Sequence, residues 1–151
     1  MSNLSALRRW WAFFALAMAT LAWCGAAQAQ DASADQLIQV ARNQAELVDQ
    51  SRAAEAWDAA SPTMKARVKR DAFAASTQAS RAQLPPVAQR TWAGVMRVRY
   101  DKDADVPAGL YGNVDFSTRL TDGSTLFELV TLRQELDGQW RLMGYVPRRS
   151  Q

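Results

Sequence analysis

Apolar residues recur at helical spacing in the segment that follows residue 30, and polar residues fill the positions between them. One stripe of this kind predicts an amphipathic helix; its members are Leu37, Ile38, Ala41, Ala45 and Val48. Ser33 is followed three residues later by Gln36, which is the pattern of a capping box. We therefore expect the first helix of the domain to begin near Ser33.

Three shorter helical stretches are predicted next, over about 52–60, 62–68 and 71–83. Ser61-Pro62 separates the first two, because serine is a favoured helix cap and proline suits the first helical position. Trp57 lies on the apolar face of its stretch, where a tryptophan is most often part of the core. In the last stretch, Phe73, Thr77 and Leu84 point the same way.

After Pro85-Pro86 the period of the pattern changes from helical to two, which is typical of half-buried strands. The first predicted strand runs from Trp92 to Tyr100 with its apolar residues at even positions. Three more are predicted at about 110–120, 125–136 and 139–147, joined by type I′ turns at Asp122-Gly123 and Asp137-Gly138. Helices and strands are segregated, so we predict an α+β fold with N-terminal helices packed on a curved four-stranded antiparallel meander.

Two-residue turns would also set the register of the last three strands. The expected facing pairs fall on both sides of the sheet and are Phe116 with Leu129, Leu129 with Val146, Val130 with Tyr145, and Leu132 with Met143. Both faces of the sheet are then partly apolar. The helices can cover one face, and the other needs a ligand, a partner subunit or the curl of the sheet itself.

Candidate site residues gather on one of these faces in the expected register. Two carboxylates, Asp115 and Glu128, lie on adjacent strands away from Phe116, where they could perform acid–base work. The tentative pocket or interface comprises Asp115, Glu128, Val130, Leu132, Met143 and Tyr145. The alternative is a surface ladder in which the same acids pair with arginines across the strands.

The first 30 residues carry no acidic side chain and have the three parts of a secretory signal peptide. Arg8 and Arg9 precede an apolar run from Trp10 to Trp23, and small residues then end in an A-x-A pattern at Ala29. We expect a signal peptide at 1–29 and a single α+β domain of unknown function at 30–151. The alternatives are an uncleaved N-terminal membrane anchor, since 18 uncharged residues approach the length of a span, and lipoprotein processing at Cys24.

Composition excludes several kinds of chemistry. The 151 residues include 18 basic and 15 acidic side chains, no histidine, and a single cysteine that cleavage after Ala29 would remove. The usual zinc, haem, iron–sulfur, Cys–His and Ser–His–Asp sites are therefore not expected, and we predict no catalytic set, cofactor or metal. Asp101, Asp103 and Asp105 alternate as in calcium loops, but the glycine and glutamate of such a loop are absent, which favours a solvated acidic loop.

Several motifs in order resemble a bacterial family known as the "domain of unknown function 4019" family. The segments that carry the resemblance are 56–61, 112–118, 128–132 and 137–145, together with Arg81, and Phe73 stands where the family usually has tryptophan. The resemblance covers about 35–147 and implies export by a Gram-negative bacterium. It also implies a nuclear-transport-factor-like or cystatin-like layout, in which a curved sheet leaves a pocket or a dimer face. It implies no activity, cofactor or catalytic residue.

These observations favour a periplasmic or secreted, non-enzymatic binding or protein-interaction module. Its expected partner is a second copy or a small hydrophobic ligand. A mature net charge of +1 gives no reason to expect nucleic acid, and membrane contact is expected only if the signal is uncleaved. The alternatives are a small pocket-bearing hydrolase-like or isomerase-like enzyme that uses carboxylates, and an N-terminally anchored envelope protein.

Overall fold

The computed structural model describes residues 33–101 and 106–149, so the predicted signal peptide and most of the acidic loop lie outside the described residues. Four helices come first: α2 (Ala34–Asp49), α3 (Ala53–Asp58), α4 (Pro62–Arg67) and α5 (Arg70–Ala82). Four strands follow: β1 (Val87–Tyr100), β2 (Gly109–Leu120), β3 (Thr125–Gln134) and β4 (Trp140–Arg148). They form one antiparallel sheet in the order β1-β2-β3-β4. This confirms an α+β fold with helices before a four-stranded meander.

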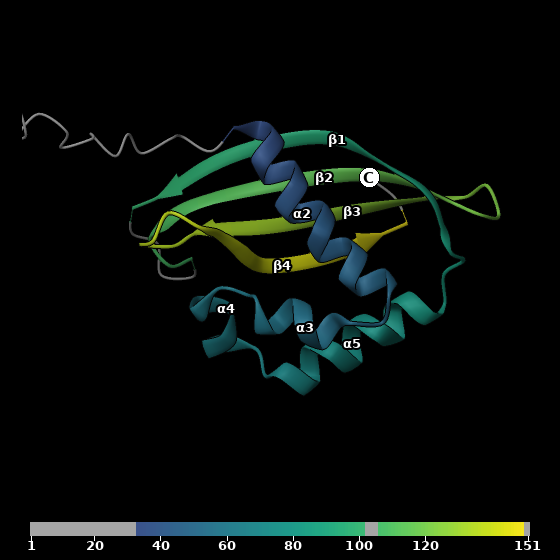
Figure 1. Cartoon of the computed structure of the whole chain (residues 1–151), viewed down its shortest axis with the longest axis horizontal. Helices are drawn as coiled ribbons and strands as arrows, with labels where there is room; N and C mark the ends of the chain where they lie inside the picture. The colour runs from purple at the N-terminus through teal and green to yellow at the C-terminus, as the bar shows by residue number, and fades with distance from the viewer. Residues whose placement is uncertain (1–32, 102–105, 150–151) are drawn as a thin grey trace, which may run out of the picture. The chain divides into compact units, whose positions relative to one another are not determined.

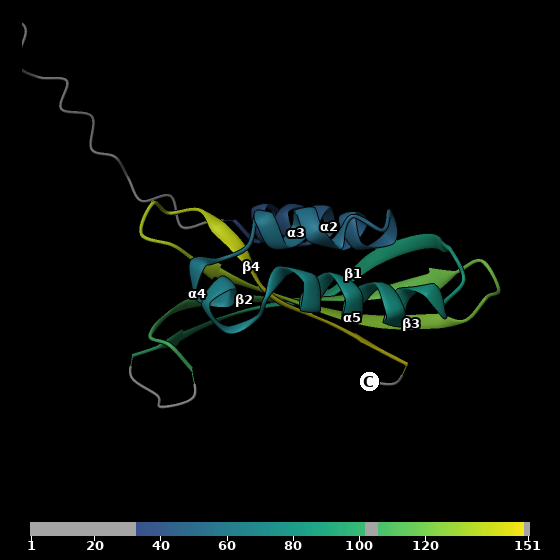
Figure 2. The ribbon, with the colours of Figure 1, turned by 90° about the horizontal axis from the view of Figure 1, so that it is seen from below.

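Helix α2 lies obliquely across one face of the sheet and contacts all four strands (Figure 1). Its buried residues are those of the predicted apolar stripe. They pack on sheet residues that are almost fully buried, including Val114, Phe116, Val130, Leu132 and Leu142. Helix α3 packs against α2 and α5, and α4 contacts β4. No helix of the described residues covers the opposite face of the sheet (Figure 2).

The helix ends follow the predicted capping chemistry. The Ser33 side chain accepts the N–H of Gln36 at 3.2 Å, and the Ser61 side chain accepts the N–H of Thr63 at 3.1 Å, with Pro62 at the first position of α4. Ser51 closes α2 with a φ of 60°. Its N–H donates to the carbonyl of Val48 at 3.0 Å, a left-handed helix end that glycine usually occupies.

Trp57 is half-buried against the core, not enclosed within it. Its indole Nε1 donates to the carbonyl oxygen of Val68 at 2.8 Å, and the ammonium of Lys65 lies 5.3 Å from its ring centroid. Trp57 was predicted to be part of the core, and it packs against the core without being enclosed by it. The polar edge of the indole is used to hold the end of α4.

The β2–β3 hairpin has a three-residue loop where a two-residue turn was predicted. The N–H of Leu120 donates to Ser124 O at 2.9 Å, and the N–H of Gly123, at φ 85°, donates back to Leu120 O at 3.0 Å. This arrangement is a type I turn followed by a left-handed residue. It shifts the register by one residue, so Phe116 faces Glu128 and not Leu129, and the predicted pairing was wrong.

The β3–β4 hairpin contains the same kind of loop, but a bulge compensates for it. Near the turn Leu132 faces Leu142, so the predicted pairing of Leu132 with Met143 was wrong. A bulge in β4 between the partners of Thr131 and Leu132 adds one residue and restores the expected register beyond it. The predicted pairs Leu129 with Val146 and Val130 with Tyr145 are confirmed.

Strand β1 also contains a bulge, between Trp92 and Gly94. Beyond the bulge, Val95 lies opposite Val114 and packs toward the helices, whereas Met96 lies on the other face and is 56% exposed. The prediction that the even positions of this strand share a buried face was therefore wrong. The extra residue at the bulge exchanges the two faces of the strand partway along it.

Candidate functional site

Glu128 is the one acidic side chain that is fully buried among the described residues, at 0% exposure. It lies in β3 on the side of the sheet that faces the helices, directly opposite Phe116. Arg90 of β1 donates to it through Nε at 2.8 Å and through Nη2 at 3.0 Å. Tyr145 of β4 donates its hydroxyl at 2.6 Å, and Thr118 of β2 donates a short hydrogen bond. All four strands thus meet at one carboxylate.

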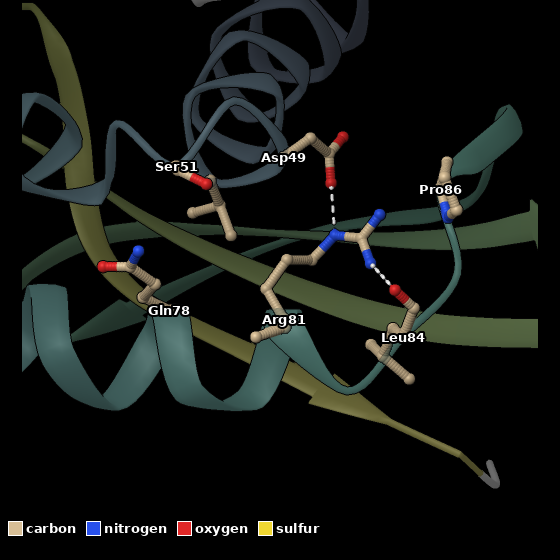
Figure 3. Close-up of a pocket in the computed structure, with 8 residues that line it drawn as sticks. Asp49, Ser51, Gln78, Arg81, Leu84 and Pro86 are labelled. Atoms are coloured by element: carbon tan, nitrogen blue, oxygen red, sulfur yellow. Dashed lines mark hydrogen bonds and ion pairs between the residues drawn. The ribbon is translucent and has the colours of Figure 1, made fainter.

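The ion pairs continue from this carboxylate toward the ends of α2 and α5. Arg90 Nη2 also donates to Asp49 at 2.9 Å, and the other oxygen of Asp49 accepts Nε of Arg81 at 2.9 Å. Arg81 Nη1 donates to the carbonyl oxygens of Leu84 and Pro85 at 3.2 and 2.9 Å. Figure 3 shows the Arg81 guanidinium held between Asp49 and Leu84. We call the alternating set Glu128, Arg90, Asp49 and Arg81 the buried ion chain.

The buried ion chain is electrostatically balanced. Burial alone would raise the pKa of Glu128, but the hydrogen bonds and positive charge of Arg90, with help from Thr118 and Tyr145, hold that pKa below its usual value. The pKa of Arg90 is raised, because Glu128 and Asp49 outweigh its burial. Burial and the neighbouring negative charge of Glu128 raise the pKa of Tyr145. Glu128 and Arg90 are therefore ionised, and Tyr145 is a neutral donor, near pH 7.

This geometry leaves Glu128 no free acceptor position. A carboxylate offers about four lone-pair sites, and Arg90, Thr118 and Tyr145 fill four of them. A general base must be within reach of the proton that it removes and must have a vacant lone pair. Glu128 has no vacant lone pair, so its contacts suit a structural role that ties the four strands together.

The structure brings together only some of the predicted site residues. Val130 and Leu132 are fully buried in the core beneath the helices, and Tyr145 reaches Glu128 from the same face. Met143 is half-buried beside the bulge of β4. Asp115 lies opposite Leu129 on the other face, so the prediction that it shares a face with Glu128 was wrong. The one-residue change of register at the β2–β3 loop is the cause.

The face of the sheet that no described helix covers is called here the open face. Its central residues alternate with those whose side chains point to the helices and are Met96, Asn113, Asp115, Ser117, Phe127, Leu129, Thr131, Gly144, Val146 and Arg148. Within this set, Arg148 of β4 reaches to Asp115 of β2 and donates to it at 3.0 Å. Phe127, Leu129 and Val146 are neighbours and form the apolar centre of the open face. Asn113, Ser117 and Thr131 beside them are polar, and Asp115 and Arg148 form an exposed ion pair.

Two cavities lie next to these features. One, of about 250 Å³, lies between α2 and α5 and is lined by Asp49, Ser51, Gln78 and Arg81 together with apolar residues (Figure 3). A groove of about 370 Å³ lies beside the ion pair Asp115–Arg148 and is also lined by Ala93, Gly94, Phe116 and Phe127.

Over residues 33–101 and 106–149, no three acidic or thiol side chains are grouped to hold a metal ion. In the same residues, none of the helices has the length and apolar character needed to cross a membrane.

Sequence reasoning missed Arg90, Asp49 and Arg81 as parts of a common cluster. A signal was present: Leu126, Glu128, Val130 and Leu132 alternate along one strand, so an acid occupies a position in an otherwise apolar series. An acid on a buried face requires a cationic partner. Nothing in the sequence says which of the 15 arginines is that partner.

Stability should change little between pH 5 and 8 and fall as the pH drops below about 4.5, the ordinary range of a carboxyl pKa. The chain has no histidine, and the pKa of Glu128 is lowered in the folded state. A lowered pKa gives stability that is present above the unfolded value and is lost as the pH falls through the folded one. Melting temperatures measured at half-unit pH intervals test this. A steep change between pH 5 and 8 would indicate a carboxyl group with a raised pKa and would favour the enzyme alternative.

Comparison with known protein families gives a match. A protein-family model described as "Protein of unknown function (DUF4019)" matches residues 40–145, which include the buried ion chain and the open face except Val146 and Arg148. Neither curated proteins nor solved structures give a match to this chain.

Proposed function

The chain belongs to the DUF4019 family of proteins of unknown function, and on that premise we propose that it is a non-enzymatic interaction module outside the cytoplasm. The proposed binding surface is the open face of the sheet, and its occupant is a second copy of the chain. The observation that carries this proposal is apolar exposure. Met96 is 56% and Val146 48% exposed, and they lie on the same face as the half-buried Phe127 and Leu129.

Exposed apolar side chains that share one face of a sheet mark a candidate site of association. The charges of the open face favour a second copy as the occupant. Asp115 and Arg148 are the only charged side chains in its centre, and they have opposite signs. A centre whose charges sum to zero can meet an identical centre without net repulsion. Arg119, Arg133 and Arg141 point to the same side but lie nearer the ends of their strands. Closed two-fold dimers, in which the same patch faces itself, are the commonest form of oligomer.

Export is part of the same proposal and rests on residues 1–29. Their basic start, apolar run and small-residue end favour a cleaved signal peptide and a periplasmic or secreted protein. N-terminal sequencing of the exported protein tests this, with Gln30 as the expected first residue. Retention of residues 1–29 would favour the anchored envelope protein instead.

The layout supports the finer fold proposal of a nuclear-transport-factor-like or cystatin-like domain. Helix α2 crosses one face of the meander, and the other face is left for association. The saturated contacts of Glu128 weigh against the enzyme alternative, as does the ion pair that engages Asp115. Alanine at Asp115 and at Glu128 remains the discriminating change, and unaltered activity in both variants would end the enzyme alternative.

Size-exclusion chromatography with light scattering tests the dimer directly. We expect twice the monomer mass for the wild-type protein, and a shift toward monomer for Val146→Lys, which places a charge in the apolar centre. Leu136→Lys is the matched control, because Leu136 is wholly exposed at the β3–β4 turn and outside the open face. A wild-type protein that stays monomeric up to millimolar concentration contradicts the proposal, as does equal dimerisation of the two variants.

A further inference from the structure

The ion pair Asp115–Arg148 is held only weakly within its own chain. Its two side chains are 48% and 42% exposed, and the contact of 3.0 Å joins a single pair of atoms, Arg148 Nη2 and Asp115 Oδ1. Exposed pairs of this kind contribute little to stability, because water screens the two charges. Either side chain can therefore exchange its partner for an equivalent one at small cost.

The groove beside this pair has space that internal packing does not use. Gly94 lies in its wall, and a Cβ at Gly94 would meet no atom within 4 Å. The φ of Gly94 is not in the left-handed region either. Neither internal packing nor the sign of φ therefore requires glycine there. The small residues Ala93 and Gly94 leave the groove of about 370 Å³ open to a group from outside the chain.

We propose that two copies of the chain exchange this ion pair across a two-fold axis, so that Asp115 of each copy binds the partner's Arg148. The proposal rests on the proposed function, since it names the contact at the centre of the same interface. Asp115 and Arg148 are in contact within one copy. A two-fold axis that lies in the interface plane and passes between them therefore places each acid over the base of the other copy. The four charges then alternate in sign.

The geometry favours this arrangement over simple apolar contact. Phe127 lines the groove next to the ion pair Asp115–Arg148. Leu129 and Val146 lie beside it on the same face of the sheet. A ring of alternating charges beside apolar side chains fixes the register of two such faces, which apolar contact alone leaves free. Complementary charges at an interface contribute mainly to specificity in this way.

The decisive experiment mixes two variants that should each fail to dimerise. Asp115→Arg gives copies in which positions 115 and 148 both carry arginine. Arg148→Asp gives copies in which both positions carry aspartate. Each variant alone should dimerise at least about tenfold more weakly than the wild type, because like charges then face each other. An equimolar mixture should form a heterodimer, in which a copy with two bases faces a copy with two acids. Native mass spectrometry identifies it, provided that one variant carries a tag of known mass.

Asp58 and Arg70 provide the matched control. They form another exposed pair, with side chains 49% and 45% exposed and a contact of 2.7 Å, between α3 and α5. Asp58→Arg and Arg70→Asp should each dimerise as the wild type does, and their mixture should contain homodimers and heterodimers in statistical proportions. Circular dichroism should give the same folded spectrum for all four variants, since every substituted side chain is exposed.

Gly94→Val gives a second test that changes no charge. It should weaken dimerisation at least about tenfold by filling the groove, and its melting temperature should stay close to that of the wild type. A dimeric wild-type protein whose two charge variants form no heterodimer would overturn the ion-pair exchange and leave the proposed function intact. A wild-type protein that is monomeric throughout would overturn both. Unchanged dimerisation of Gly94→Val would contradict the role of the groove.

Discussion

Arg90→Met should lower the free energy of unfolding by about 3–5 kcal/mol, the usual cost of removing one partner from a buried ion pair. The side chain of Arg90 is 4% exposed and that of Glu128 0%. Without Arg90, the Glu128 carboxylate keeps only Thr118 and Tyr145 as donors, and Asp49 loses one of its two arginines. For a domain of this size the melting temperature should fall by roughly 10–20 °C.

The pH dependence of this variant has a definite sign. Removal of the Arg90 charge should raise the pKa of Glu128 above its unfolded value, because burial then dominates. A raised carboxyl pKa makes the folded state bind the proton more tightly, so stability is lost as the pH rises through it. The gap in melting temperature between Arg90→Met and the wild type should therefore narrow as the pH falls from 7 toward 5.

A double-mutant cycle separates the ion pair from general packing. Arg90→Met combined with Glu128→Leu should cost clearly less than the sum of the two single changes, since two apolar side chains can replace a buried pair. Val48→Ala is a useful control, because it shortens a buried side chain of α2 that takes no part in the ion chain. Additive effects of Arg90→Met and Glu128→Leu would contradict an energetic coupling between Arg90 and Glu128.

Local signals in the sequence were sufficient for the helices and for the order of the strands, although β1 begins at Val87 and not at the predicted Trp92. The stripe from Leu37 to Val48, the cap at Ser33 and the restart at Ser61-Pro62 are all present in the structure. These features depend on residues a few positions apart, and propensity and capping act over that range. The order of helices before a meander followed from the same signals.

Register was harder to predict because it depends on single residues in the turns. Asp122-Gly123 predicts a two-residue turn, but Gly123 takes the left-handed position at the end of a three-residue loop. Two- and three-residue loops share the same preference for glycine, so the sequence does not choose between them. The difference of one residue moved Glu128 from the face of Asp115 to the face of Phe116.

The same limit applies to the candidate site. Glu128 and Tyr145 were predicted to lie near each other and do so, because their strands are adjacent and that part of the register was right. Arg90 and Asp49 could not be placed, since they lie 38 and 79 residues from Glu128 and meet it only through tertiary packing. Arg81 was noted only as a family motif position, and its contacts lie with Asp49 at the end of α2.

Gly112→Ala should cost about 1–3 kcal/mol, as expected when a methyl group is forced into a packed core. A Cβ at Gly112 would lie 2.8 Å from Leu37 Cδ2 and 3.2 Å from the ring of Trp140. Leu37 is 0% exposed, so its side chain has little room to turn away. The absence of a side chain at Gly112 is what lets α2 approach the sheet closely at this point.

Urea denaturation of a small set of variants tests this close approach. Leu37→Val removes the Leu37 methyl carbons, Cδ1 and Cδ2, that the new methyl group meets, so the double variant Gly112→Ala and Leu37→Val should cost less than the two single changes added together. Gly94→Ala is the matched control: it makes the same chemical change on another strand, where no atom lies within 4 Å, and should be close to neutral. If Gly112→Ala is as harmless as Gly94→Ala, then the contact of Leu37 with Gly112 does not set the position of α2. A cost confined to Gly112 and relieved by Leu37→Val would instead identify this contact as the one that positions α2 against the sheet.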